Sequence, residues 1–135
     1  MTYVEKDRRV ELELFGFQGE SQQILPSGGR LIAHRDGSTG WVMPSALESN
    51  ETWADAVERL IISLGGEDVV SGLIESLNPQ RRTVVIHVPF DSPYQENNGL
   101  TAATVQLLAR LGLELDVGPL DFDPRNPTHL ADGYD

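Results

Sequence analysis

The stretch LTAATVQLLARLGLELDV, residues 100–117, contains a helix with both ends marked and the strand that follows it. The hydroxyl of Thr101 can accept a hydrogen bond from the first helical turn, which is the role of an N-cap residue. Gly112 is expected to end the helix in the left-handed conformation, and Leu113 then falls where a Schellman motif packs onto Leu108. Beyond Gly112 the apolar residues alternate instead of recurring every three or four positions. The stretch predicts a helix packed on a sheet and indicates no chemistry.

The sequence VELELFGF, residues 10–17, has the pattern of a strand. Its first apolar residues alternate with Glu11 and Glu13, which is typical of a strand with one buried and one solvated face. The two phenylalanines that follow fall on the parity of the glutamates. Either the strand passes under a helix at its end, or Gly16 marks a β-bulge that switches the faces. Residues 18–24 predict a short helical turn.

Three further segments also predict strands. Residues 30–33 and 40–43 are short apolar runs, and the Asp-Gly pair at 36–37 between them favours a hairpin. Residues 83–88 are β-branched on both parities except for His87, which is typical of a central strand covered on at least one face. By itself, His87 is expected to be a hydrogen-bonded residue of the sheet.

Helical spacing of apolar residues covers most of residues 53–77. Ser49 or Asn50 is the expected N-cap. The Gly65-Gly66 pair interrupts the pattern and a second apolar stripe follows, so one kinked helix and two helices fit equally well. The first stripe consists of Trp53, Ala56, Val57, Leu60 and Leu64, and the second of Val69, Val70, Leu73, Ile74 and Leu77.

Together these segments predict an α+β fold. We expect one mixed, mainly antiparallel sheet with the helices packed on one face, a two-layer sandwich. With 135 residues, of which 39% are hydrophobic, the chain can bury a single core, which we place in one domain over residues 1–118. Residues 119–135 form an acidic C-terminal tail that either docks through Leu120 and Phe122 or stays mobile.

The composition restricts the class of partner. The formal net charge of -11 disfavours nucleic acid and anionic membrane surfaces and favours a basic protein partner. The chain has no cysteine, which excludes disulfides and thiolate metal sites. Charges interrupt the first fifteen residues where a secretory signal needs an apolar run, and no run reaches membrane-spanning length. We therefore expect a cytoplasmic protein.

The histidines and acidic residues are the candidates for metal binding and catalysis. The three histidines lie far apart, without the HxH or HExxH spacing of metal ligands. The pairs Glu11 with Glu13 and Glu114 with Asp116 could hold a hard cation or divide acid and base roles, since alternate strand residues share a face. Each pair lies opposite the apolar parity, so both are expected to be solvated. We predict no catalytic residue, no metal site and no cofactor.

Residues 89–98, PFDSPYQENN, form a long segment without periodicity, and long loops often carry function. A binding site under this loop would use His87, Asp91 and Tyr94, with Trp41 as an exposed aromatic neighbour. The alternative for Trp41, and for Trp53 on its helical stripe, is a place in the core.

The order of these segments, and above all LLARLGLELD at 107–116 after Gly99-Leu100-Thr101, resembles the bacterial family called domain of unknown function 4279. In that family a glycine-rich loop leads into a Leu-Thr or Leu-Ser helix cap and a similar run. Weaker similarity covers 10–17, 30–43 and 52–88. The resemblance implies the fold. The family has no assigned reaction and no catalytic residues, so the resemblance implies no site.

Three functions remain open from the sequence. The first is a non-catalytic protein-binding module, immunity-like or antitoxin-like, whose acidic surface neutralises a basic partner. The second is a small-molecule-binding or enzymatic domain with its site under the 89–98 loop. The third is a structural module that forms a homodimer through an uncovered strand edge. The absence of a catalytic signature favours the protein-binding module. It also favours a protein that is not an enzyme.

Overall fold

Among the described residues, the central sheet contains five strands, and the first of them along the chain lies in the middle of the sheet. A computed structural model describes residues 8–48, 50–89 and 99–120. The elements are β1 Arg9–Phe17, the 3-10 helix η1 Gly19–Ile24, β2 Arg30–Ala33, β3 Thr39–Ala46, α2 Trp53–Ser63, α3 Glu67–Leu77, β4 Arg81–Pro89, α4 Ala102–Leu111 and β5 Glu114–Leu120.

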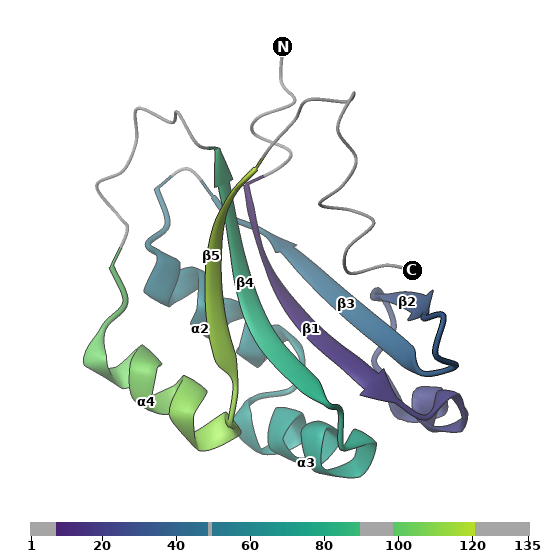
Figure 1. Ribbon diagram of the computed structural model, residues 1–135. Helices are drawn as coiled ribbons and strands as arrows, with labels where there is room; N and C mark the ends of the chain where they lie inside the picture. Colours follow the sequence, from purple (N-terminus) through teal and green to yellow (C-terminus); the bar gives the residue numbers. More distant parts are fainter. Residues whose placement is uncertain (1–7, 49, 90–98, 121–135) are drawn as a thin grey trace.

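The strands lie in the order β2-β3-β1-β4-β5. Neighbouring strands are antiparallel except for β4 and β5, which are parallel and joined through α4. Helices α2, α3 and α4 cover one face of the sheet (Figure 1). The predicted mixed, mainly antiparallel α+β fold is therefore confirmed, and so is the predicted hairpin between residues 30–33 and 40–43.

The core lies between the sheet and the helices. The alternating residues Val10, Leu12 and Leu14 of β1 are each 0% exposed and pack against apolar side chains of all three helices. Trp41 of β3, which pairs with Leu14 of β1, belongs to the same cluster. We define the open face of the sheet as the face opposite the helices. It carries the residues of β1 that alternate with these core residues.

Gly16 forms the bulge that was one of the two explanations for the phenylalanines. Its φ is +83°, and the pairing of β1 with β3 shifts register between Phe15 and Phe17. Phe17 thereby joins the core under the helices, whereas Phe15 packs with Ile32 and Val42 in a separate small cluster. A glycine is needed here because L-residues with side chains rarely adopt this backbone conformation.

The ends of α4 follow the local signals in the sequence. The hydroxyl of Thr101 accepts a hydrogen bond from the Thr104 amide at 3.2 Å, and Gly112 is left-handed at φ 67°. The amide of Leu113 donates to the Leu108 carbonyl at 2.9 Å, which is the outer bond of a Schellman motif. Leu108 and Leu111 are buried, whereas Leu115 on the edge strand β5 is 41% exposed.

Residues 53–77 form two helices. Gly65 and Gly66 both have positive φ, 113° and 97°, so the chain cannot continue as one helix through them. The N-cap of α2 is Thr52, whose hydroxyl accepts from the Asp55 amide at 3.1 Å, and the prediction of Ser49 or Asn50 was wrong. The helix begins later because a turn, closed by the Glu51 amide on the Glu48 carbonyl, precedes it.

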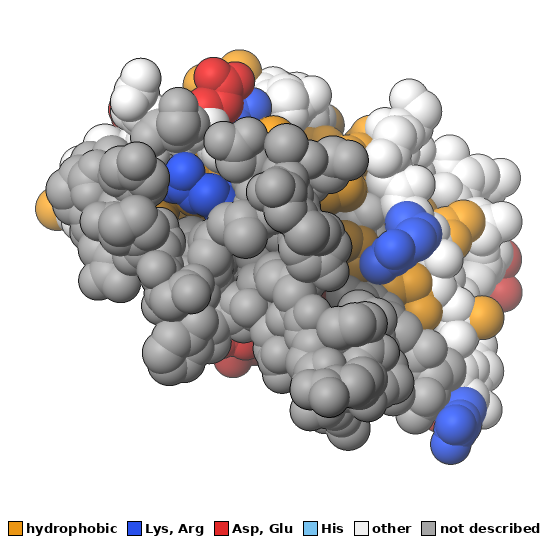
Figure 2. Space-filling view, turned by 90° about the horizontal axis from the view of Figure 1, so that it is seen from above, with side chains coloured by type: hydrophobic (Ala, Val, Ile, Leu, Met, Phe, Trp, Pro, Cys, Tyr) orange, Lys and Arg blue, Asp and Glu red, His pale blue; other side chains and the backbone are white. Residues whose placement is uncertain are grey.

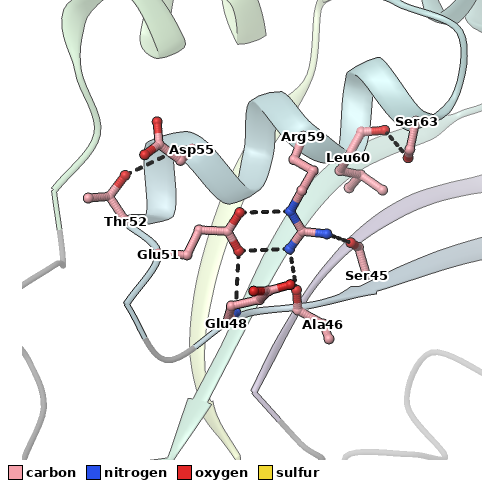
Figure 3. A network of polar contacts seen from close by, with 9 residues as sticks. All are labelled: Ser45, Ala46, Glu48, Glu51, Thr52, Asp55, Arg59, Leu60 and Ser63. Carbon is pink, nitrogen blue, oxygen red and sulfur yellow. Dashed lines mark hydrogen bonds and ion pairs between the residues drawn. The ribbon is translucent and has the colours of Figure 1, made fainter.

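Arg59 of α2 holds that turn against the end of β3 (Figure 3). Its guanidinium donates to both carboxylate oxygens of Glu51, each at 2.7 Å, to the Ser45 hydroxyl at 3.0 Å and to the Ala46 carbonyl. The bidentate hydrogen bonds and the charge of Arg59, which outweigh the effect of burial, lower the pKa of the Glu51 carboxyl. All these groups have partners within the fold, so we assign the network to structure.

Two boundaries differ from the sequence analysis. Strand β3 continues through Pro44 to Ala46 because β2 pairs only with residues 39–42, and a strand with one remaining neighbour accepts a proline. Strand β5 ends at Leu120, two residues past the boundary at 118. Most of the acidic tail, and the side chains of Leu120 and Phe122 with it, lie outside the described residues.

Candidate functional site

The open face of the sheet brings two glutamates and a histidine together near its centre. Glu11 and Glu13 point to this face because they alternate with the core residues of β1. In the pairing of β1 with β4, Arg9 lies opposite His87 and Glu13 opposite Thr83. We call Glu11, Glu13 and His87 the carboxylate–histidine cluster.

One ligand atom from each member of this cluster lies within 4.8 Å of the others. The Nε2 atom of His87 is 3.3 Å from Oε2 of Glu11, while Arg9 Nε donates to Oε1 of the same carboxylate at 2.5 Å. The prediction that His87 is a hydrogen-bonded sheet residue is confirmed by this contact. Glu11 therefore has one oxygen committed to Arg9 and the other directed to His87.

Both glutamates are buried, with Glu11 4% and Glu13 8% exposed. The expectation that this pair is solvated was wrong. The predicted face was correct, since both side chains lie opposite the helices. They are nevertheless buried, because β1 is the central strand and residues of β3 and β4 flank it on both sides. The second pair, Glu114 and Asp116 of the edge strand β5, is exposed as predicted.

Glu11 and Glu13 have opposite pKa shifts. Burial alone would raise the pKa of Glu11, but hydrogen bonds and charges from His87 and Arg9 together outweigh it and lower the pKa to about 2. For Glu13, burial and then the hydrogen bond and negative charge of Glu11 raise the pKa to about 7, against the opposing charge of Arg81. Below about pH 7, Glu13 is therefore neutral and can donate a hydrogen bond to the Glu11 carboxylate.

Thr83 adds an unsatisfied hydroxyl beside the cluster. It is only 2% exposed and lies directly across the strand pair from Glu13, and its Oγ1 is buried without a hydrogen-bond partner among the described residues. A buried hydroxyl without a partner costs free energy, so its presence needs an explanation. A bound ion or a water held by such an ion would provide the missing partner.

The cluster contains the ligand types of a divalent cation. Carboxylate oxygens and a histidine nitrogen bind Zn²⁺, Mn²⁺ and Fe²⁺ at roughly 2.0–2.2 Å, which places neighbouring ligand atoms roughly 3–4 Å apart. The observed separations, within 4.8 Å, are close to this range and need only small side-chain movements. No metal site was predicted from the sequence, because Glu11 and His87 are 76 positions apart and only the pairing of β1 with β4 brings them together.

The other residues of the loop-site hypothesis are not brought together with His87. Trp41 is 1% exposed in the core and lies on the opposite face of the sheet, so its expected alternative role as a core residue is the one observed. Asp91 and Tyr94 lie outside the described residues. The signal for the cluster was the shared parity of the two glutamates, but sequence spacing alone could not add His87.

The described surface lacks the features of two other classes of site, a nucleic-acid interface (Figure 2) and a membrane span. In the described part of the face that Figure 2 shows, the positive side chains stand apart from one another. This view offers no continuous basic track of the kind that binds nucleic acid. Within residues 8–48, 50–89 and 99–120, none of the helices has the length and apolar character to cross a membrane.

Comparisons with protein-family models, with curated proteins and with solved structures found no match to this chain.

Proposed function

We propose that this protein binds a divalent metal ion on the open face of its sheet, with Glu11, Glu13 and His87 as ligands. The observation that carries the proposal is the convergence of these three side chains from two neighbouring strands, with ligand atoms within 4.8 Å of one another. The buried Thr83 hydroxyl, which has no partner, supports it independently.

The charges on this face favour a cation. Glu11 and Glu13 are buried on this face. The register of β5 with β4 places Glu114 and Asp116 on the same face of the sheet. The described positive side chains nearest to the glutamates are Arg9, which is bound to Glu11, and Arg81, whose charge acts on Glu13. A metal ion would replace the proton of Glu13 and sit between Glu11 Oε2 and His87 Nε2, leaving the contact of Arg9 with Oε1 in place.

The mixture of oxygen and nitrogen ligands indicates which metals to test. Two carboxylates and one imidazole suit Zn²⁺, Mn²⁺ or Fe²⁺ better than Ca²⁺, which prefers six to eight oxygens. Water molecules would complete the coordination of any of these ions, and one of them could donate a hydrogen bond to the Thr83 hydroxyl oxygen. The proposal concerns binding and assigns no reaction to the site.

Titration of untagged, EDTA-treated protein with Zn²⁺ and with Mn²⁺ by calorimetry tests the proposal. We expect one ion per chain and binding at least about tenfold weaker in Glu13→Gln and in His87→Gln, since each removes a ligand. Glu75→Gln, an exposed change on α3, is the matched control and should bind as the unmodified protein does. Circular dichroism establishes that each variant folds.

Two results would contradict the metal site. One is the absence of stoichiometric binding for both ions by a folded protein. The other is an equal loss of affinity in Glu75→Gln and Glu13→Gln, which would mean that the ions associate with the acidic surface in general.

The acidic composition supports a second candidate, the non-catalytic module for a basic protein partner. Exposed Glu114 and Asp116 on the edge strand β5 provide a specific surface for it. We expect a partner captured from a bacterial lysate at low salt to dissociate at high salt and to be lost with Glu114→Gln/Asp116→Asn. Capture that this double change leaves intact would count against the surface.

A further inference from the structure

A pocket of ≈ 310 Å³ lies on the open face beyond Glu13, around the bulge of β1. Phe15 and Gly16 of β1, His34 and Arg35 of the β2–β3 turn, and Gln80 and Arg81 at the start of β4 line it. We call it the bulge pocket. Its volume is at the lower end of the range for small-molecule sites.

The walls of the bulge pocket are set by close packing. The rings of Phe15 and His34 meet edge to face, with centroids 5.2 Å apart. They fit because Gly40 has no side chain, since a Cβ there would lie 2.7 Å from both His34 Nε2 and Phe15 Cδ1. His34 Nε2 is itself buried, and no described group forms a hydrogen bond with it. The contact between Phe15 and His34 thus fixes one side of a pocket that is broadly open to solvent.

Positive side chains predominate around the bulge pocket in a chain whose net charge is -11. Arg35 and Arg81 both line it, and the one carboxylate among the lining residues, Asp36, is engaged by the Ser38 amide at 2.9 Å and the Ser38 hydroxyl at 2.6 Å. Within the described part of the chain, Arg81 makes no hydrogen bond or ion pair that would occupy its guanidinium.

We propose that the bulge pocket binds a small oxyanion, the carboxylate or phosphate group of a small molecule, through Arg81. A guanidinium presents paired N–H donors that match the oxygens of either group, and the Gln80 amide beside it offers a further donor. The apolar Phe15 ring gives the rest of such a molecule a surface to pack on.

This site is separate from the carboxylate–histidine cluster. Arg81 pairs with Phe15 in the register of β1 and β4, one pair of open-face residues beyond Glu13 and Thr83. None of the three proposed metal ligands lines the bulge pocket. Anion binding is therefore expected in EDTA and in Glu13→Gln, so the two proposals can fail independently.

Arg82 provides a matched control for Arg81. The two arginines are adjacent on β4, but Arg82 pairs with Leu14 and so belongs to the helix side of the sheet. Arg81→Gln and Arg82→Gln remove the same charge from the same strand on opposite faces. A general electrostatic effect would act on both variants equally.

Titration of the ¹⁵N-labelled protein with inorganic phosphate, and separately with benzoate, tests the proposal by amide chemical shifts at constant ionic strength set with NaCl. We expect saturable shifts of Gly16, Gly37 and Ser38 with at least one of the two anions, weakened about tenfold or more in Arg81→Gln and retained in Arg82→Gln. The arm that saturates identifies a phosphate or a carboxylate ligand.

The proposal would be overturned if neither phosphate nor benzoate shifted these amides beyond the NaCl control. Equal weakening in both arginine variants would overturn it as well, because the effect would then come from net charge. Spectra of the two variants without ligand show whether each retains the fold.

Discussion

Gly29→Ala is expected to lower the free energy of unfolding by about 2–3 kcal/mol, at the upper end of the usual cost of overpacking a core. An added Cβ would lie 2.1 Å from Nε1 of Trp41 and 2.6 Å from its Cε2. Trp41 cannot move away easily, because it is 1% exposed and packed in the main core cluster. Urea unfolding followed by circular dichroism measures the difference.

Gly72→Ala is the matched control for this prediction. Gly72 lies inside α3, where an added Cβ would meet nothing within 4 Å. Alanine favours the helix over glycine by up to ~1 kcal/mol, so this variant should be slightly more stable than the unmodified protein. Equal stability of Gly29→Ala and Gly72→Ala would refute the packing of Trp41 against Gly29.

The second large effect is a dependence of stability on pH that comes from Glu13. Its pKa is raised from 4.5 to about 7 in the folded protein, mainly by burial and then by Glu11. Between these two values the folded state holds a proton that the unfolded state has released, so the free energy of unfolding falls as pH rises. The total loss over this window is about 3 kcal/mol.

Glu13→Gln isolates this contribution, because glutamine is neutral like protonated Glu13. We expect the variant to be about 3 kcal/mol more stable than the unmodified protein at pH 8 and similar to it near pH 4.5. Chemical unfolding at several pH values in EDTA measures the difference, with Glu75→Gln as the control. A difference that does not change with pH would contradict the raised pKa of Glu13.

Glu11 acts in the opposite direction at lower pH. Its pKa is lowered to about 2, because His87 and Arg9 outweigh the effect of burial. The stability that this ionised carboxylate provides is present above pH 4.5 and is lost as the pH falls toward 2. Glu11 therefore affects a different pH window from Glu13, and the comparison with Glu13→Gln above pH 4.5 is free of it.

The parts of the fold that were predictable from sequence depend on neighbours along the chain. Thr101 and Gly112 act within one helical turn, so the local pattern was sufficient for α4. At Gly16 the sequence allowed a bulge as one of two explanations, and the structure shows the bulge. The N-cap of α2 was missed because the Glu48–Glu51 turn, held by Arg59 eight residues later, delays the helix.

The candidate site was not predictable because it depends on burial and register. Alternation placed Glu11 and Glu13 on the correct face, but it did not show that their side chains are buried there, which depends on the position of β1 between β3 and β4. His87 reaches Glu11 through the pairing of β1 with β4, which no local spacing encodes. The strand order brings two glutamates that are close in sequence together with a histidine that is distant from them.

The position of β1 also has a consequence for synthesis on the ribosome. This strand emerges first, yet one of its two long edges stays without its partner until β4 has been translated, after β2, β3 and two helices. Until then a nascent chain presents unpaired amides and carbonyls beside Leu12 and Leu14, a surface that attracts other chains. The interval between these strands is therefore the period in which the newborn protein most needs a chaperone.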